Sequence, residues 1–567
     1  MAGMARSAIR PLLALTLMVL GLGAAPAQAA PERVLVVVGA QPGQTRAAVR
    51  QVERLGGDVG RRLKIVNGFA ARVPAGSIDR LRRARAIRTV ARDVALHMSS
   101  GAPVADPALA DQPPAIDPPP AEIPSDAPAD QVAGEAIAQA ADDAAAHASL
   151  VPDPVASGED TAAADPLAGE PVADDALGRA HASMDLIRAA AGVEGSGLTG
   201  AGVDVAMIDS GVLGVAALDG PRKLVRGPDF SDDAYDPDLR GLDAFGHGSH
   251  MAGVIAGADP ATGYQGVAPG ARLVSVKVAG ADGATSLVRV LMALDWVRRN
   301  RRAGGLRIRV LNLSLGVDLR RSYVREPLAY AAERLWNRGI TVVAAAGNQA
   351  DGTGRLDLPA ADPFLIAVGA TDTRRTPDPA DDVVAAFSSR DAVRPPDVVA
   401  PGTGVISLRV PGSALDQEFS AARVGDRFFR GSGTSQAAAV VSGMVALLLE
   451  ARPELTPDQV KALLRAGAVD LPAANVSADG AGRVDLARTL ALATPSAADA
   501  LQPFQPAVLD LTALWTDLDE EARGDAARVG TGENGWNGRS WSGRSWSGRS
   551  WSGRSWSGSD WSEDDGS

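Results

Sequence analysis

Three short segments, far apart in the sequence, place an acid, a base and a hydroxyl in a fixed order. They are Ile208–Gly211, His247–His250 and Gly433–Ala437, and they contain Asp209, His247 and Ser435. A serine hydroxyl is a poor nucleophile until an imidazole accepts its proton, and that imidazole needs a carboxylate to hold its tautomer. The chain is therefore constrained to folds that bring three distant loops together.

The choice of a general base is narrow, because the sequence has only five histidines. Two of them, His247 and His250, share one motif, and the other three lie before the first motif (His97, His147 and His181). The pair in the motif could also suggest a metal site on a helix, but no nearby carboxylate completes one. We therefore expect no metal among the site residues.

Composition excludes several classes of protein. The net charge of −12 argues against nucleic acid as a partner, and 46% hydrophobic residues allow a sizeable core. The sequence contains no cysteine, which rules out disulfides and thiolate metal sites. Residues 1–29 are typical of a secretory signal, with Arg6 and Arg10 before the apolar run Pro11–Leu22 and a small-residue cleavage site before Ala30. We expect a secreted, extracellular protein; an uncleaved membrane anchor is the alternative.

The segments that follow have different compositions. Residues 30–98 predict a small α+β module, with strands at Arg33–Val38, Leu63–Val73 and Ile87–Val90 and helices at Thr45–Leu55 and from Ala75–Ser77 to Arg85. Residues 99–180 are rich in Ala, Asp and Pro and poor in large apolar residues, which predicts a disordered linker.

Residues 181–492 alternate between short apolar strands and helical spacing. Strands are predicted at Val203–Ile208, Arg272–Val278, Arg309–Leu315, Thr341–Ala346 and Phe364–Val368, and helices at Leu287–Arg299, Leu328–Asn337 and Thr434–Glu450. This order predicts an α/β fold with a mostly parallel sheet and helices on both faces. Asp209 and Asn348 follow predicted strands, where such folds place their sites, and Ser435 begins a predicted helix.

The C-terminal part consists of a linker over residues 493–530 and a repeat over residues 531–567. Its unit is Trp-Ser-Gly-Arg-Ser, and Trp recurs every five residues from Trp536 to Trp561. Exposed Trp and Arg suggest contact with the cell envelope, whereas the Gly and Ser content also fits a flexible spacer. Both interpretations stay open.

Residues 181–492 resemble the catalytic domain of the subtilisin-like serine peptidases, the subtilases. The resemblance is carried by motifs in the family's order: Gly202–Gly211, His247–Gly253, Gly266–Ala271, Asn312–Gly316, Val342–Asn348, Val399–Gly402 and Gly433–Ser435. Two positions after the nucleophile depart from the usual pattern, Gln436 and Ala439. Neither residue transfers a proton, so we expect activity to survive the difference.

The resemblance implies a role for each site residue. Ser435 is the nucleophile, His247 the base and Asp209 its partner, while Asn348 and the Ser435 backbone N–H stabilise the oxyanion. The family's substrate strand matches Leu313, Ser314, Leu315 and Gly316, and one wall of the pocket for the residue before the cut matches Ala345, Ala346 and Gly347. These small residues favour a roomy, apolar-tolerant pocket. The chemistry requires no cofactor, and structural calcium is left open.

Residues 30–98 resemble the family's inhibitory propeptide, chiefly through Asn67–Pro74. The implied function is a secreted, monomeric serine endopeptidase that acts on proteins or peptides through an acyl-enzyme. It is made as a zymogen that its own propeptide inhibits, with self-cleavage near Met98–Ser99 or later in the linker. The alternatives are a catalytically silent surface-binding protein on the same scaffold and a peptide-ligating acyl transferase.

Overall fold

The structure is a computed structural model, and it describes residues 32–98, 172–220, 223–316, 323–350, 355–472, 476–502 and 504. The predicted signal at 1–29, linker residues 99–171 and the repeat at 531–567 lie outside the described residues, so those predictions stay predictions.

The N-terminal module is an antiparallel sheet of order β2-β3-β1-β4. Its elements are β1 (Arg33–Ala40), α1 (Thr45–Arg54), β2 (Asp58–Leu63), η1 (Lys64–Val66), β3 (Gly68–Pro74), η2 (Ala75–Ser77), α2 (Ile78–Arg82) and β4 (Ile87–Arg92). Because side chains alternate along a strand, Val36 and Val38 of β1 share a core with α1 and α2, while Val37 belongs to the main core of the chain. One face of the module sheet thus belongs to the same core as the main sheet described below.

The main sheet has the order β14-β13-β12-β10-β6-β8-β7, with β15 also paired to β13. Its strands are β6 (Asp204–Asp209), β7 (Leu224–Asp229), β8 (Arg272–Lys277), β10 (Ile308–Leu313), β12 (Thr341–Ala345), β13 (Ile366–Asp372), β14 (Val383–Val384) and β15 (Val398–Pro401). The pairings are parallel except for β13–β14. The predicted α/β fold with a mostly parallel sheet is confirmed.

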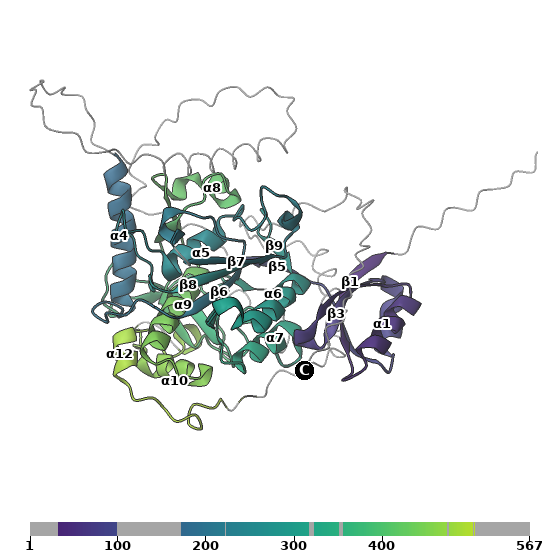
Figure 1. Ribbon diagram of the computed structural model, residues 1–567. Helices are drawn as coiled ribbons and strands as arrows, with labels where there is room; N and C mark the ends of the chain where they lie inside the picture. The colour runs from purple at the N-terminus through teal and green to yellow at the C-terminus, as the bar shows by residue number, and fades with distance from the viewer. Residues whose placement is uncertain are drawn as a thin grey trace, which may run out of the picture. The chain divides into compact units, whose positions relative to one another are not determined.

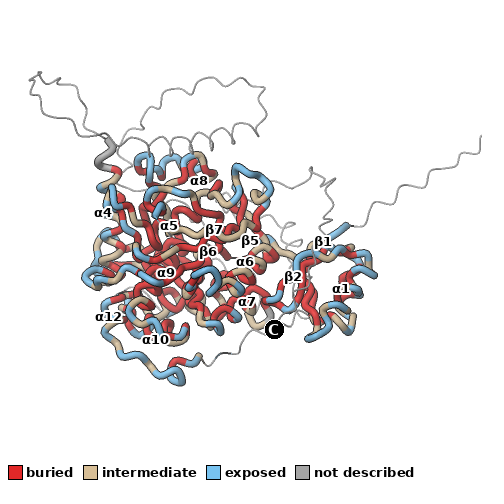
Figure 2. The backbone as a smooth tube through the Cα atoms, viewed as in Figure 1, coloured by how far each residue is buried: buried red, intermediate tan, exposed pale blue. Residues whose placement is uncertain are grey.

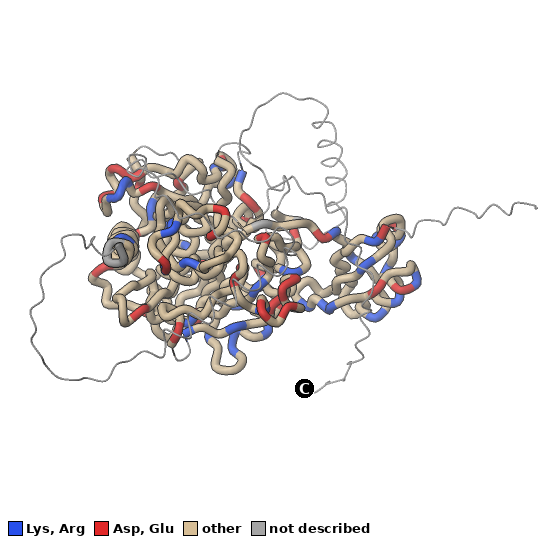
Figure 3. The backbone as a smooth tube through the Cα atoms, turned by 90° about the horizontal axis from the view of Figure 1, so that it is seen from above, with Lys and Arg blue, Asp and Glu red and all other residues tan. Residues whose placement is uncertain are grey.

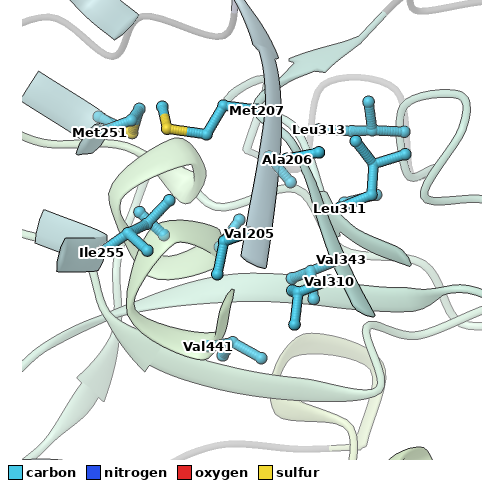
Figure 4. Close-up of a cluster of buried hydrophobic side chains, with 14 of the residues drawn as sticks. Val205, Ala206, Met207, Met251, Ile255, Val310, Leu311, Leu313, Val343 and Val441 are labelled. Atoms are coloured by element: carbon cyan, nitrogen blue, oxygen red, sulfur yellow. The ribbon is translucent and has the colours of Figure 1, made fainter. Parts of the chain in front are cut away.

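Helices cover both faces of this sheet (Figure 1). They are α5 (His247–Ala256), α6 (Leu287–Asn300), α7 (Pro327–Trp336) and α9 (Thr434–Ala451). In Figure 4, Val310 and Val343 point toward Val441 of α9, whereas Leu311 points to the opposite face. Strands buried on both faces need continuous apolar runs, which is why β6 and β10 lack the alternation of a half-exposed strand. The tube in Figure 2 is accordingly red through this sheet.

Smaller elements complete the described chain. One small sheet joins β11 (Leu315–Gly316), β5 (Ala95–Met98) and β9 (Ala284–Ser286), and another joins β16 (Val405–Leu408), β18 (Phe428–Gly431) and β17 (Arg423–Val424). The remaining helices are α8 (Ala414–Glu418), α10 (Pro457–Gly467), α11 (Val476–Asp479) and α12 (Leu486–Ala491), with short 3₁₀ turns at Ala216–Leu218, Asp232–Tyr235, Ala303–Gly305, Tyr323–Arg325 and Ser420–Ala422.

The predicted linker boundary at residue 180 differs from the structure. Helix α4 (Val172–Ala190) begins inside the segment assigned to the linker, and its residues Ala176 and Ala180 are buried. Ser183 accepts a hydrogen bond from the backbone N–H of Ile406 in β16. Composition was misleading because small alanines pack closely against a neighbouring strand without the large apolar side chains that usually mark a core helix.

The distribution of charged residues and the burial of the one long apolar helix among the described residues are those of a folded α/β protein. Acidic and basic residues are interspersed along the described chain (Figure 3). Helix α9 is long and apolar enough to cross a membrane by composition, but almost all of it is buried inside the protein. We therefore interpret α9 as a core helix.

Replacement of a buried residue of β10 tests this packing. Leu311 is fully buried, so Leu311→Ala is expected to lower the free energy of unfolding by about 2–5 kcal/mol, because it removes apolar contacts and leaves a cavity. Chemical denaturation in a Ser435→Ala background, which prevents self-digestion, measures this loss. Val393, which is 94% exposed, provides the control Val393→Ala with a change within about 0.5 kcal/mol. Equal midpoints for both variants would contradict the described core.

Candidate active site

The acid and the base meet at the carboxyl end of β6. Asp209 is the last residue of that strand, and its Oδ1 lies 2.8 Å from Nδ1 of His247, the first residue of α5. The same Oδ1 accepts the backbone N–H of Ser210 at 2.8 Å. Both side chains are buried. This contact fixes Nδ1 as the nitrogen facing the carboxylate, and it leaves Nε2 to exchange protons.

The electrostatics of His247 favour its charged form. Burial alone lowers the pKa of His247, but the charge of Asp209, its hydrogen bond and the charge of Asp243 raise it, and the net shift is upward. His250 behaves oppositely, because burial and the nearby charge of His247 lower its pKa to about 3. His250 therefore stays neutral at ordinary pH.

The start of α5 depends on a residue that sequence reasoning missed. Asp243 accepts hydrogen bonds from the backbone N–H groups of Gly246 and Ser249, at 2.8 and 2.7 Å. It also accepts the Ser210 hydroxyl at 2.7 Å. Asp243 thus connects the strand end that holds Asp209 to the helix start that holds His247. An acid a few residues before a helix start is a capping signal that could have identified it.

Glycine is required where α5 approaches β6. A Cβ on Gly248 would lie 2.1 Å from the carbonyl oxygen of Gly211, so any side chain at this position would collide with backbone. The close approach brings the first turn of the helix against the end of the strand, which sets the distance from Asp209 to His247.

Ser435 is the second residue of α9 and is buried. Helices α5 and α9 pack against each other, and both place their site residue in the first turn. The Ser435 hydroxyl donates to the carbonyl oxygen of Ser314 at 3.4 Å, and Nε2 of His247 has no hydrogen-bond partner. The described state therefore brings Asp209 and His247 into contact and directs the Ser435 hydroxyl toward Ser314.

Asn348 lies beside the start of α9. Its Oδ1 accepts both the backbone N–H and the hydroxyl of Thr434, at 2.9 and 3.0 Å, and the Gly347 N–H donates to the same hydroxyl at 3.1 Å. Since both lone pairs of Oδ1 are used, the amide can offer further groups only its Nδ2–H donors.

The predicted substrate strand is interrupted at Ser314, and the residues on either side of it belong to two different sheets. Leu313 ends β10 and is paired with Ala344 in the main sheet, and Ser314 lies at the break. Leu315 and Gly316 form β11 and pair antiparallel with Met98 and His97 of β5. On its other side, β5 pairs antiparallel with β9. The end of the N-terminal module thus occupies the strand position predicted for substrate.

The predicted pocket wall is not wholly apolar. Ala345 ends β12, Ala346 and Gly347 follow it, and Ala345 and Ala346 are buried, as expected. However, the carboxylate of Asp357 lies against Gly347 and Gly316. Residue types alone gave no reason to place this carboxylate there, and the expectation of a roomy, apolar-tolerant pocket stays a prediction.

Other predicted features lie near the site. Gln436 lines a small cavity beside His247 and His250, together with Leu415 of α8 and Phe419, which directly follows α8. In the described ranges, no group of three or more His, Cys, Asp or Glu is arranged to hold a metal. Ala439 is buried inside α9.

A buried Asp–His pair at the end of a parallel strand, with a serine in the first turn of a helix packed on α5, is compatible with a hydrolase that uses a serine nucleophile. Residues 200–485 match the model of the subtilase family, Peptidase S8. The chain belongs to the subtilase family, whose members are serine peptidases.

Individual relatives agree with this assignment. The serine protease AprX of Bacillus subtilis is 37% identical over 300 residues, which is 51% of this chain and 66% of the relative. Subtilisin Savinase of Lederbergia lenta is 33% identical over 286 residues, 50% of this chain and 90% of the relative. The structure of fervidolysin from Fervidobacterium pennivorans, described as a keratinolytic enzyme related to subtilisin, superposes with a TM-score of 0.55 at 21% identity. That match covers 82% of this chain and 62% of fervidolysin, and it supports the fold alone.

The opposite shifts of the two histidines can be measured by NMR on a Ser435→Ala protein. His247 is expected to titrate above its ordinary value of about 6.5, while His250 stays neutral down to about pH 4. Asp209→Asn removes the nearby negative charge and leaves burial as the main influence, so the pKa of His247 is expected to fall. An unchanged His247 pKa in this variant would contradict the described contact.

Proposed function

We propose that this chain is a secreted serine endopeptidase that uses Asp209, His247 and Ser435 as a catalytic triad. The observation that carries the proposal is the buried 2.8 Å contact between Asp209 and His247, at the end of a central strand and beside the helix that begins with the nucleophile motif. Family membership supports the same chemistry.

The proposed reaction needs only groups of the protein and water. After the Ser435 side chain rotates toward His247, its Oγ attacks the peptide carbonyl carbon while Nε2 takes the hydroxyl proton. The Asn348 amide and the Ser435 backbone N–H stabilise the oxyanion. The C–N bond then breaks, His247 gives its proton to the leaving amine, and an acyl-enzyme on Ser435 remains. Water, activated by His247, hydrolyses the ester and restores the serine.

We further propose that residues 30–98 act as an inhibitory propeptide. The antiparallel pairing of β5 with β11 and β9 holds an extended peptide by its backbone, which is a general mode of peptide recognition. Met98, the last residue of β5, pairs with Leu315, which directly follows Ser314, and the carbonyl of Ser314 contacts the Ser435 hydroxyl.

A second contact anchors this module away from the strand. Asp93 Oδ1 accepts the backbone N–H of Val288 at 2.9 Å, in the first turn of α6. The carboxylate satisfies a helix-end N–H that otherwise lacks an intrahelical partner. The module thus stabilises α6 of the catalytic region while β5 covers the site, which supports a role in both folding and inhibition.

Hydrolysis of casein by the wild type and by Ser435→Ala tests the triad. The variant is expected to lose about 10⁶-fold in kcat, the magnitude for loss of the serine nucleophile in subtilisin, a member of the same family. Ser442→Ala, which removes a buried hydroxyl of the same helix bonded to Asn312, is the matched control and should retain most activity. Equal turnover by the wild type and Ser435→Ala would refute the assignment and would favour the silent binding protein.

N-terminal sequencing of the secreted product tests processing. The wild type is expected to begin at or beyond residue 99, because Met98, the last residue of β5, pairs with Leu315 next to Ser314. The Ser435→Ala protein is expected to begin at Ala30, with the module still covalently attached. A wild-type product that begins at Ala30 would contradict autoprocessing.

A further inference from the structure

A buried lysine lies at the end of the sheet that carries the site, and none of the assigned roles uses it. Lys277 is the last residue of β8 and pairs with Asp209, the last residue of β6. Because neighbouring strands lie about 4.8 Å apart, the two residues end adjacent strands at the same level. Lys277 is only 2% exposed. A charged ammonium is stable in a protein interior only where fixed partners compensate it.

The partners of this ammonium all belong to one segment of the chain. Its Nζ donates to the backbone carbonyls of Leu239 and Leu242, and it forms an ion pair with Asp233 at 2.7 Å. Since a lysine has three N–H donors, these three oxygens account for all of them. The side chain of Lys277 therefore joins the end of β8 to the segment 233–242.

That segment ends where the start of α5 is fixed. Leu242 directly precedes Asp243 in the sequence. The Asp243 carboxylate accepts two backbone N–H groups at the start of α5, and it also accepts the hydroxyl of Ser210, which follows Asp209. The first residue of α5 is His247. A shift of the Leu242 carbonyl therefore moves the carboxylate that sets the position of the imidazole.

Close packing connects Lys277 to the same place by a second route. A Cβ on Gly211 would lie 2.5 Å from the carbonyl oxygen of Leu242 and 3.2 Å from Cδ of Lys277. The lysine stem and the carbonyl that it binds thus both lie against the chain two residues after Asp209. The carbonyl oxygen of Gly211 in turn lies against Gly248, in the first turn of α5.

The positive charge of Lys277 is also needed where it lies. Burial is the largest influence that raises the pKa of Asp233, and the charges of Asp229 and Asp282 add to it, whereas the hydrogen bond and charge of Lys277 lower it. Asp229 also holds the same segment, because it accepts the backbone N–H of Gly241 at 2.9 Å. Without the ammonium these carboxylates repel one another, and the segment loses the cation that binds its carbonyls.

We propose that Lys277 is a positioning residue for the peptidase reaction, because it fixes the segment that places Asp243 and, through it, His247. The inference rests on the proposed function and adds a residue to it. Lys277 acts through backbone carbonyls and Asp243 rather than by contact with the peptide. Its loss should therefore slow the chemical step and leave peptide binding nearly unchanged.

The substitution Lys277→Met removes the ammonium and keeps an apolar stem. After active-site titration to completion with a fluorophosphonate, kcat for a peptide anilide is expected to fall by roughly 10- to 100-fold, the order for a catalytic group displaced by up to about 1 Å, with KM changed by less than about threefold. Lys277→Gln keeps N–H donors without the charge and should lose less. It is the variant to use if Lys277→Met does not fold.

A second measurement requires no activity. It is the NMR titration of His247 in a Ser435→Ala background, with and without the Lys277 substitution. The charge of Asp243 raises the pKa of His247. If Asp243 moves away in Lys277→Met, this pKa falls. Loss of a nearby cation alone would raise it, because less positive charge would oppose the imidazolium. The direction of the change therefore identifies movement of Asp243.

The matched control is Lys461→Met. Lys461 is also buried, donates to the backbone carbonyls of Pro363 and Leu365, and pairs with Asp397 at 3.0 Å. Leu365 directly precedes β13, so this lysine lies at the amino end of a strand, whereas the site lies at the carboxyl ends. Breaking either buried pair lowers stability. Only the Lys277 variants should change kcat of the titrated enzyme and the pKa of His247.

The outcomes separate the two proposals. A wild-type kcat in the Lys277 variants, a loss that appears only in KM, or a His247 pKa that stays or rises overturns the role of Lys277 and leaves the peptidase intact. A loss of kcat of the same size in Lys461→Met also overturns it, since this would indicate a general loss of stability. Absence of both labelling and hydrolysis in the wild type overturns the peptidase proposal, while the NMR titration still tests how His247 is positioned.

Discussion

The contact between Asp209 and His247 is the interaction on which the site depends. It joins the end of an interior strand to the first turn of a buried helix, and it exists because Gly248 and Asp243 hold those two ends in place. A buried carboxylate raises the pKa of the imidazole against the effect of burial. The same contact commits Nδ1, so that Nε2 is left to move protons. The parallel sheet also positions the site, since Asp209 ends β6 and Asn348 follows the carboxyl end of β12.

The N-terminal module contacts the chain next to this site. Its β5 pairs with β11 and β9, and Asp93 accepts an N–H of α6. These contacts join the module both to the strand next to Ser314 and to the first turn of α6. The proposed removal of the module therefore changes both accessibility and stability, which is consistent with a chain that has no disulfide to stabilise its folded state.

Much of the main sheet and the identity of the central residues could be predicted from the sequence. Buried parallel strands such as β6 and β12 contain continuous apolar runs, and the motifs around Asp209, His247 and Ser435 are local. Non-local features could not be predicted in this way. β5 and β11 are too short to show periodicity, and β2 is polar because it is largely exposed. The position of Asp357 depends on how its segment folds back onto Ala346 and Gly347, which no local pattern encodes. The start of α4 was missed because its buried residues are alanines.

The most direct test of the central claim is whether the three residues act as one unit. The measurement compares kcat/KM for the single variants Asp209→Ala, His247→Ala and Ser435→Ala with that of the triple variant, after normalisation for folded protein. Groups that act together give non-additive losses. The account predicts that Ser435→Ala alone costs about as much activity as the triple variant. Losses that multiply through to the triple variant would contradict it, because they would mean that the three side chains contribute independently.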